Sequence, residues 1–111
     1  MITSLQNPNI QKIRSLVSQS KERKRSQQFV IEGVRLCEEA MHAEWDFDSI
    51  FYSENLSDRG RTILERAHLK NIPVEEIPFS LMKKVAGTET PQGILCILSH
   101  KNQTPPKNLN F

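Results

Sequence analysis

A basic run near the N-terminus is the first feature with a chemical implication. Residues 18–28 read SQSKERKRSQQ and contain no apolar side chain. If the run is helical, Lys21, Lys24 and Arg25 fall at i, i+3 and i+4 and share one face. Such a cluster can contact several phosphates, with an affinity that falls as the salt concentration rises. A charge run is also commonly a solvated face, so the pattern leaves both interpretations open.

A polar loop carries the second candidate site. Residues 87–93 read GTETPQG, with a glycine at each end and a proline that stiffens the turn. Thr88, Thr90 and Gln92 supply hydrogen-bond donors and acceptors without adding charge. Loops of this kind bind sugars, phosphates or base edges, and an ordinary connecting loop is the alternative.

A third candidate lies at Glu32 and Gly33, which come directly after the apolar run FVI at residues 29–31. A glycine between a strand and a helix lets the helix N-terminus face a phosphate of a ligand. Arg35 then falls in the first turn of that helix. A simple packing glycine is an equally good interpretation of Gly33.

The sequence patterns do not predict a catalytic or metal site. The 111 residues contain no G-x-G-x-x-G, no G-x-x-x-x-G-K-[ST] and no G-x-S-x-G. The two cysteines and three histidines lack zinc-ligand spacing. Cys37 and Cys96 have apolar neighbours, which favours two buried thiols, although a single disulfide stays open. We therefore expect no metal site and no catalytic residue in this chain.

The net charge of +2 hides an uneven distribution. Residues 1–36 hold seven basic and two acidic side chains, whereas residues 37–68 hold three basic and eight acidic ones. This polarity predicts one face for a polyanion and another turned away from it. No apolar run reaches the roughly 18 residues of a membrane helix, and the first 28 residues lack the apolar block of a secretory signal. We therefore expect a cytoplasmic protein that binds no membrane.

Hydrophobic periodicity predicts the elements that position these residues. The expected order is a helix over about 8–18 capped by Asn7, a strand over 28–32, a helix over 34–43, a strand over 49–53, a helix over 58–70 capped by Ser57 or Asp58, a weak strand over 73–77, a short helix capped by Ser80, and a strand over 94–98. Asp46 and Asp48 are expected to break the second helix, and Gly87 to end the short helix in a left-handed cap. Residues 18–28 either extend the first helix or form a short exposed one.

Alternating short strands and helices predict an α/β fold, with one layered domain over residues 1–99, a four-stranded mixed sheet and flanking helices. The polar tail, residues 100–111, contains a proline pair and is expected to be a linker. If strands 28–32 and 94–98 are antiparallel neighbours, residues 32–35 and 88–93 share one rim of the sheet. The basic run then enters the first strand from its opposite end and reaches a ligand along a flank.

Three stretches of the sequence carry a family resemblance. They are ITSLQNPNIQKIRSL at residues 2–16, KERKRSQQFVIEGVRLCEEAM at 21–41 and GTETPQGILCIL at 87–98. Together they resemble the N-terminal substrate-binding domain of SpoU/TrmH-type RNA 2′-O-methyltransferases. The specific part is the combination of F-x-x-E-G-x-R-L after a basic run with T-x-T-P-Q-G. The resemblance implies a ribosomal-protein-like RNA-binding fold.

The resemblance also implies how such a domain is used. In that family it precedes a knotted catalytic domain, which binds S-adenosylmethionine, transfers the methyl group and forms a homodimer. The present chain would then hold no cofactor and perform no catalysis alone. Its implied partner is structured RNA, with ribosomal RNA expected. The residues expected to bind RNA are Lys12, Arg14, Lys21, Arg23, Lys24, Arg25, Glu32, Gly33, Arg35, Thr88, Glu89, Thr90, Gln92 and Gly93.

Two other functions stay open from the sequence. A stand-alone, non-enzymatic RNA- or ribosome-binding protein of the same fold would share every feature above. The gene sequence beyond Phe111 separates that protein from an enzyme. A protein-interaction module would instead use the acidic face of residues 37–68.

Overall fold

The computed structural model describes residues 1–100, so most of the expected linker over 100–111 lies outside the described residues. The elements are α1 (Pro8–Ser18), α2 (Ser20–Ser26), β1 (Gln28–Glu32), α3 (Val34–His42), β2 (Asp46–Tyr52), α4 (Asp58–Leu69), β3 (Val74–Glu76), α5 (Phe79–Val85) and β4 (Ile94–Ser99). Within the described residues, no helix is both long enough and apolar enough to cross a membrane.

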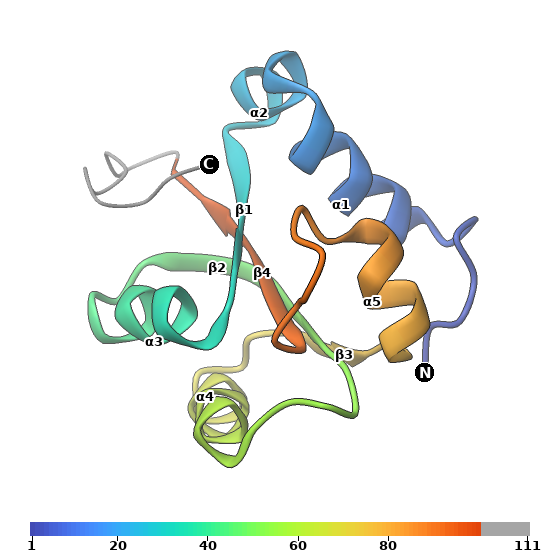
Figure 1. The fold of residues 1–111 in the computed structure, drawn as a ribbon. Coiled ribbons are helices and arrows are strands. Elements are labelled where there is room, and N and C mark those ends of the chain that lie inside the picture. The colour runs from blue at the N-terminus through green and yellow to red at the C-terminus, as the bar shows by residue number, and fades with distance from the viewer. Residues whose placement is uncertain (101–111) are drawn as a thin grey trace.

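The four strands form one mixed sheet in the order β1-β4-β2-β3. Strand β4 pairs antiparallel with both β1 and β2, whereas β2 and β3 run parallel. Helices α3 and α4 lie on one side of the sheet and α1 and α5 on the other (Figure 1). The expected α/β fold with a four-stranded mixed sheet is therefore confirmed.

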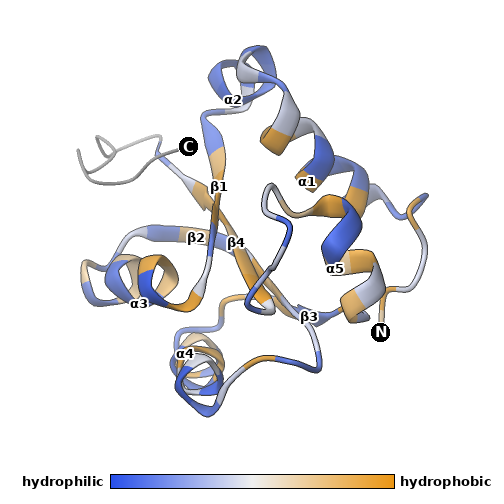
Figure 2. Cartoon of the chain, viewed as in Figure 1, coloured by the Kyte–Doolittle hydropathy of each residue, from blue (hydrophilic) through white to orange (hydrophobic). Residues whose placement is uncertain are grey.

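Strand β4 forms the centre of the core because all six of its residues are buried. Successive side chains point to opposite faces of a strand. Ile94 and Cys96 pack in the cluster of α3 and α4, whereas Leu95 and Ile97 pack in the cluster of α1 and α5. Strand β4 thus supplies apolar residues to both faces of the sheet. In Figure 2 this strand is largely hydrophobic, whereas α2 is hydrophilic.

The basic run forms a separate short helix, one of its two expected states. Gln19 is extended (φ −127°, ψ 108°) and ends α1 before α2 begins. Helix α2 has no buried residue, so the expectation that it lies outside the core is confirmed, whereas Gln28 at the end of the run is buried in β1. The expected Asn7 cap is also present, since its side chain accepts from the Asn9 N–H at 2.8 Å.

The expected break at Asp46 and Asp48 is wrong. Helix α3 already ends at His42, and the chain turns through Glu44, whose φ is 57°. Strand β2 starts at Asp46, three residues before the expected Ser49, and contains a bulge between Phe47 and Ser49. Asp48 accepts a hydrogen bond from Lys12 Nζ at 3.3 Å. The bulge and this ion pair accommodate an acidic residue within the strand.

Both expected boundaries of α5 are wrong. The helix begins at Phe79, before Ser80, and the Phe79 N–H donates to the two Glu54 carboxylate oxygens at 2.9 and 3.1 Å. A carboxylate from the β2–α4 turn therefore satisfies that N–H. At the other end, α5 stops because Ala86 is extended (φ −71°, ψ 150°). The glycines in the left-handed region are Gly33 and Gly93, not Gly87.

The two cysteines are free and buried, as the favoured interpretation predicts. Cys37 on α3 and Cys96 on β4 have their Sγ atoms 3.2 Å apart. Burial raises the pKa of the Cys96 thiol. The two buried thiols act as small apolar side chains between the helix and the sheet.

Candidate nucleic-acid interface

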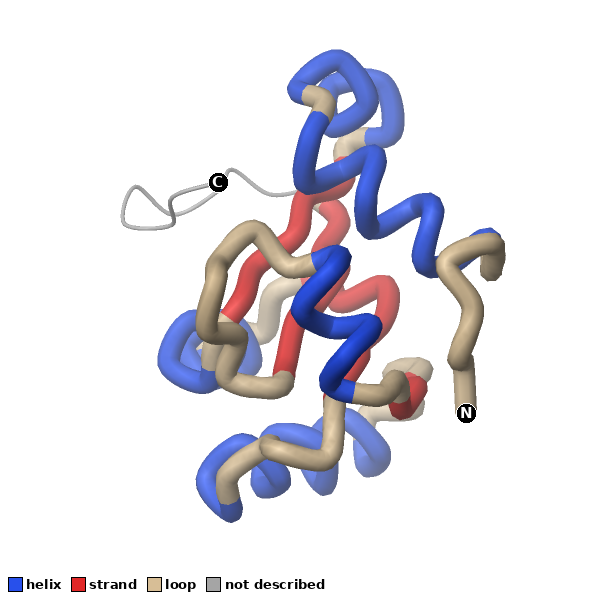
Figure 3. The backbone as a smooth tube through the Cα atoms, turned by 45° about the vertical axis from the view of Figure 1, so that its right-hand side comes forward, coloured by secondary structure: helices blue, strands red, loops and turns tan. Residues whose placement is uncertain are grey.

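The end of β1 and the start of β4 form one rim of the sheet. Glu32 lies opposite Leu95 in the antiparallel register, and the Gly33 N–H donates to Ile94 O at 3.1 Å. The loop between α5 and β4 returns to the sheet beside the β1–α3 junction (Figure 3). The structure therefore brings residues 32–35 and 87–93 together, and we call these two segments the rim.

Gln92 joins the two segments of the rim. Its Oε1 accepts from the Val34 N–H at 2.8 Å and so caps the N-terminus of α3. Gly33 permits this approach, since it has φ 94° and a Cβ there would lie 3.2 Å from the Gln92 Oε1. The place expected for a ligand phosphate is thus held by a side-chain amide. No described residue accepts from Gln92 Nε2, so its two N–H donors remain available to a ligand.

The base of the loop is fixed against the turn between β2 and α4. The Ser53 N–H donates to Gly93 O at 2.9 Å, and Asn55 Nδ2 donates to Pro91 O at 3.3 Å. A Cβ at Gly93 would lie 2.7 Å from Asn55 Oδ1 and 3.0 Å from the backbone N of Leu56. Because the loop is anchored there, Gln92 has a defined position, while Thr88, Glu89 and Thr90 stay exposed at the tip.

Three adjoining hollows run along the rim and make one groove. The central one, of about 370 Å³, is lined by Glu32, Gly33, Arg35, Leu36, Thr88, Thr90 and Gln92. It shares Glu32, Leu36 and Thr88 with a hollow of about 410 Å³ toward α1, and Arg35 and Gln92 with one of about 420 Å³ toward α4. Seven of the expected RNA-binding residues therefore line one groove: Arg23, Glu32, Gly33, Arg35, Thr88, Thr90 and Gln92. Gly93 and Glu89 line none of these hollows.

The expected cations differ in how freely they face solvent. Arg14, Lys21 and Lys24 are exposed and make no ion pair within residues 1–100. Arg25 pairs with Glu22 at 2.7 Å, and Lys12 pairs with Asp48. The Arg25 guanidinium lowers the pKa of the Glu22 carboxyl. The exposed cations of α2 lie at the end of β1 opposite the rim (Figure 1).

Arg23 has a role that the spacing did not reveal. Its Nη1 donates to Leu16 O at 2.7 Å and to Val17 O at 3.3 Å. It therefore satisfies carbonyls at the C-terminus of α1, where cations also interact favourably with the helix dipole. The same side chain lines the hollow toward α1, so it connects α2 with the groove.

Asn55, Ser57 and Arg59 line the groove toward α4 and were missed by sequence reasoning. They belong to a turn and helix that are far from the rim in the sequence. Arg59 Nη2 also lies 2.6 Å from Glu38 Oε1, which links α4 to α3 and lowers the pKa of Glu38. Only the observed contact between the β2–α4 turn and the rim reveals these residues.

Comparisons with known proteins identify the family and agree with the fold. Residues 7–96 match the family model of the MRM3-like substrate binding domain. A comparison with curated protein sequences finds no match. Among solved structures, an rRNA methyltransferase from Sinorhizobium meliloti is 23% identical, with a TM-score of 0.75 over 90% of this chain and 36% of its own.

Two further structures share the fold. One described as an RNA 2′-O ribose methyltransferase is 23% identical, with a TM-score of 0.76 over 97% of this chain and 40% of its own. The SpoU methyltransferase AviRb from Streptomyces viridochromogenes, with bound AdoMet, is 19% identical, with a TM-score of 0.69 over 84% of this chain and 33% of its own. The present chain thus spans two fifths or less of the length of these structures.

Proposed function

The chain belongs to the family of MRM3-like substrate-binding domains, and from that membership we propose that it is the RNA-recognition domain of an RNA 2′-O-ribose methyltransferase. The full enzyme uses S-adenosylmethionine and acts on structured RNA, with ribosomal RNA as the substrate. Support comes from its structural relatives, which include rRNA and RNA 2′-O ribose methyltransferases and an AdoMet complex. Residues 1–99 form the binding domain, and the remaining residues lead toward the catalytic domain.

The groove along the rim is the observation that carries this proposal. It combines neutral donors and acceptors with the Arg23, Arg35 and Arg59 side chains. Sequence-specific RNA recognition usually targets unstacked bases, which are read on their edges by groups of this kind. The exposed cations of α1 and α2 neutralise phosphates along a flank without reading sequence. The cations of α1 and α2 therefore position the RNA, whereas the groove discriminates between RNA sequences.

We assign no S-adenosylmethionine site to this chain, because its 111 residues contain none of the glycine-rich nucleotide-binding motifs. This chain's residues bind and orient RNA, while methyl transfer and dimerisation belong to a separate domain of the full enzyme. Calorimetry with the 111-residue chain should therefore show no saturable binding of S-adenosylmethionine. Saturable binding would contradict this division.

Crosslinking tests the proposed substrate directly. The chain should crosslink to ribosomal RNA through residues of the rim and of α2, and the crosslinked nucleotides should cluster around one structured site. Crosslinks scattered over the RNA at the level of unrelated transcripts would contradict a recognition role. Sequencing of the gene past Phe111 separates the two RNA-binding candidates. A downstream methyltransferase domain supports the enzyme, and a stop codon supports the stand-alone RNA-binding protein.

A further inference from the structure

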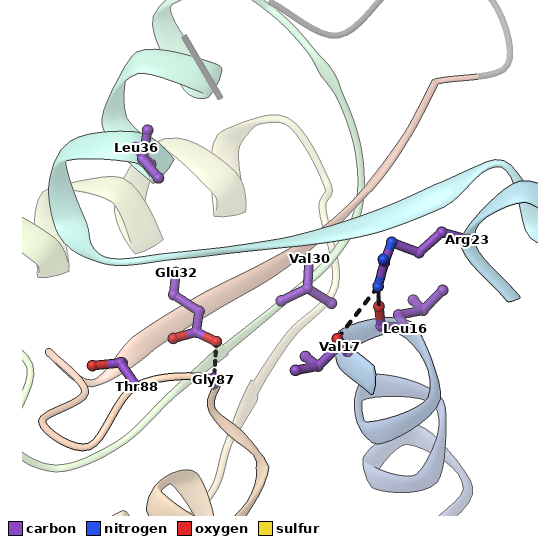
Figure 4. A pocket seen from close by; sticks show the side chains of 8 residues that line it. All are labelled: Leu16, Val17, Arg23, Val30, Glu32, Leu36, Gly87 and Thr88. Atoms are coloured by element: carbon purple, nitrogen blue, oxygen red, sulfur yellow. Dashed lines mark hydrogen bonds between the residues drawn. The ribbon is translucent and has the colours of Figure 1, made fainter. Parts of the chain in front are cut away.

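The hollow toward α1 differs from the rest of the groove in the chemistry of its walls. Leu16 and Val17 from α1, Val30 from β1 and Leu36 from α3 supply apolar surface, while Arg23 and Glu32 supply the charged groups (Figure 4). We propose that this hollow receives one unstacked guanine base of the bound RNA, with the Glu32 carboxylate accepting from its Watson–Crick edge. The inference rests on the proposed function and assigns a subsite within it.

The apolar walls favour a base over a phosphate. A phosphate that enters this hollow loses its water and meets aliphatic side chains that offer no hydrogen bonds. An unstacked base instead has two apolar faces to bury and a polar edge to satisfy. The volume of about 410 Å³ belongs to an open hollow, so the sugar and phosphate of the same nucleotide stay in solvent.

Glu32 selects against anions and for hydrogen-bond donors. Its Oε1 accepts from the Gly87 N–H, which fixes the carboxylate in the hollow (Figure 4). Within residues 1–100, no cation lies within ion-pair distance of this carboxylate. Its remaining lone pairs are available, because a carboxylate accepts at about four positions. The Glu32 carboxylate therefore repels phosphate groups. It instead favours ligand groups that can donate an N–H to it.

Guanine is the base whose edge fits this acceptor best. Its N1–H and N2–H groups lie side by side and match the two oxygens of a carboxylate. Adenine and cytosine each present an amino group beside a ring nitrogen that is itself an acceptor. Uracil presents one N–H group between two carbonyl oxygens. Only guanine therefore meets Glu32 without placing an acceptor against the carboxylate.

Gly87 keeps the hollow open. Its φ is outside the left-handed region, so the backbone there does not require a glycine. A Cβ at this position would lie 3.1 Å from Glu32 Oε1 and 3.6 Å from Val17 Cγ1. A side chain at residue 87 would thus project between these two walls. The absence of a side chain leaves the space that the base occupies.

Arg23 gives the hollow a fixed planar group. The bonds from Nη1 to the carbonyls of Leu16 and Val17 hold its guanidinium in place before RNA binds. Arginine planes stack on unpaired bases in RNA complexes. Because the side chain is already ordered, stacking on it costs little conformational entropy. Arg23 is therefore the stacking partner that we assign to the guanine.

Short RNAs test the guanine assignment with the 111-residue chain. The dissociation constants of U6 and of otherwise identical hexamers with one central G, A or inosine are measured by fluorescence anisotropy. We expect the G hexamer to bind about fivefold or more tightly than the A hexamer, since a matched bidentate contact discriminates by that amount or more. Inosine, which lacks the N2 amino group, should fall between them.

Two variants assign the preference to the hollow. Glu32→Gln keeps an oxygen for the Gly87 N–H, and Gly87→Leu fills the space; both should reduce the ratio of G to A binding to about one. Each variant is judged by the ratio of its dissociation constants for the A and G hexamers. A change in net charge affects both hexamers equally, so it leaves this ratio unchanged. Glu65→Gln removes one charge from an exposed position on α4 outside the groove and should keep the wild-type ratio. Circular dichroism checks that each variant is folded.

The outcomes separate this inference from the proposed function. Equal, salt-dependent binding of the G and A hexamers by the wild-type chain would overturn the guanine subsite and leave the RNA-binding role intact. A G preference that survives in folded Glu32→Gln and Gly87→Leu variants would also overturn it. Failure of the wild-type chain to bind any RNA would contradict both.

Discussion

The rim and helix α2 both present polar residues to solvent, but they are built in opposite ways. On the rim, side chains are fixed by specific contacts, such as Gln92 with the Val34 N–H and Glu32 with the Gly87 N–H. Helix α2 has seven residues, none of them buried, and its Arg23 side chain donates hydrogen bonds to carbonyls of α1. Fixed groups discriminate between ligands, whereas solvent-exposed cations attract any polyanion. We therefore expect these two regions to make separable contributions to the proposed RNA binding.

Charge reversal on α2 should give the largest effect. Lys24→Glu with Arg25→Glu removes two cations and adds two anions at the flank that we propose contacts phosphates. All RNAs should bind roughly 30- to 100-fold more weakly, and the slope of log K against log salt should flatten by about two. Titrations at several salt concentrations measure both quantities. An effect on cognate RNA alone would contradict this assignment.

Loss of polar groups on the rim should instead reduce discrimination. Thr90→Ala and Gln92→Ala should each lower the preference for cognate over unrelated RNA by roughly 1–3 kcal/mol if a base edge is read. Neither substitution changes the charge, so the salt slope should stay the same. Competition binding against an unrelated structured RNA gives the preference. A flattened salt slope without loss of preference would break the distinction between the two regions.

Gln92 should also contribute to the stability of the free domain. Gln92→Ala leaves the Val34 N–H without its cap and should lower the free energy of unfolding by about 1 kcal/mol. Gln92→Glu keeps an oxygen at that position and adds a negative charge at the helix N-terminus, so it should preserve stability. Urea denaturation of the three proteins measures the difference. Equal unfolding midpoints for wild type and Gln92→Ala would argue against the cap.

Amide exchange compares the local stability of α2 with that of the sheet. In the free domain, residues 18–27 should exchange faster than β4, because α2 has no buried apolar anchor. Arg23→Met should accelerate exchange in α2 further by removing its bond to the Leu16 carbonyl, while β4 remains protected. Hydrogen exchange with mass spectrometry resolves these segments. Slow exchange throughout α2 would show that this helix is as firmly ordered as the sheet.

Acid should produce the smallest effect, at the ion pair between Glu38 and Arg59. Arg59 holds the pKa of Glu38 below its ordinary value of 4.5. The stabilisation is thus complete above that ordinary value and is lost as the pH falls through the lowered pKa. Glu38→Gln should remove this part of the acid dependence, while the rest of the unfolding curve stays unchanged. Thermal unfolding between pH 7 and pH 3 tests this, and an unaltered profile would contradict it.

Local sequence patterns predicted the sheet and the rim because both depend on apolar alternation and strand order. The run ILCIL identified β4. The structure pairs β1 and β4 antiparallel, as the sequence analysis assumed for strands 28–32 and 94–98. Helix boundaries set by distant contacts were not predictable in this way. The Glu54 carboxylate satisfies an N–H at the start of α5, so a local Ser80 cap is unnecessary. Asp46 and Asp48 were interpreted as breakers because their pairing with other elements is not visible in the local sequence.

The roles of the candidate site residues were also only partly predictable, because they depend on contacts between residues far apart in the sequence. The polar loop and the β1–α3 junction were identified from glycines and residue types, and the structure brings them together. The cap that Gln92 places on α3 spans 58 positions in the sequence, so no local spacing reveals it. Arg23 resembled several equivalent cations, but its bonds to the Leu16 and Val17 carbonyls distinguish it from Lys24. Residue type therefore identified candidate groups, and tertiary contacts determined their roles.

Binding of one structured ribosomal RNA fragment across a salt series tests the central claim most directly. The wild-type chain, the Lys24→Glu/Arg25→Glu variant and the Thr90→Ala/Gln92→Ala variant are compared on this fragment and on an unrelated structured RNA. We predict that the α2 variant has a flatter salt slope with its preference intact, and that the rim variant has a reduced preference with its slope intact. If both variants change the same quantity by the same amount, the division between the rim and α2 is wrong.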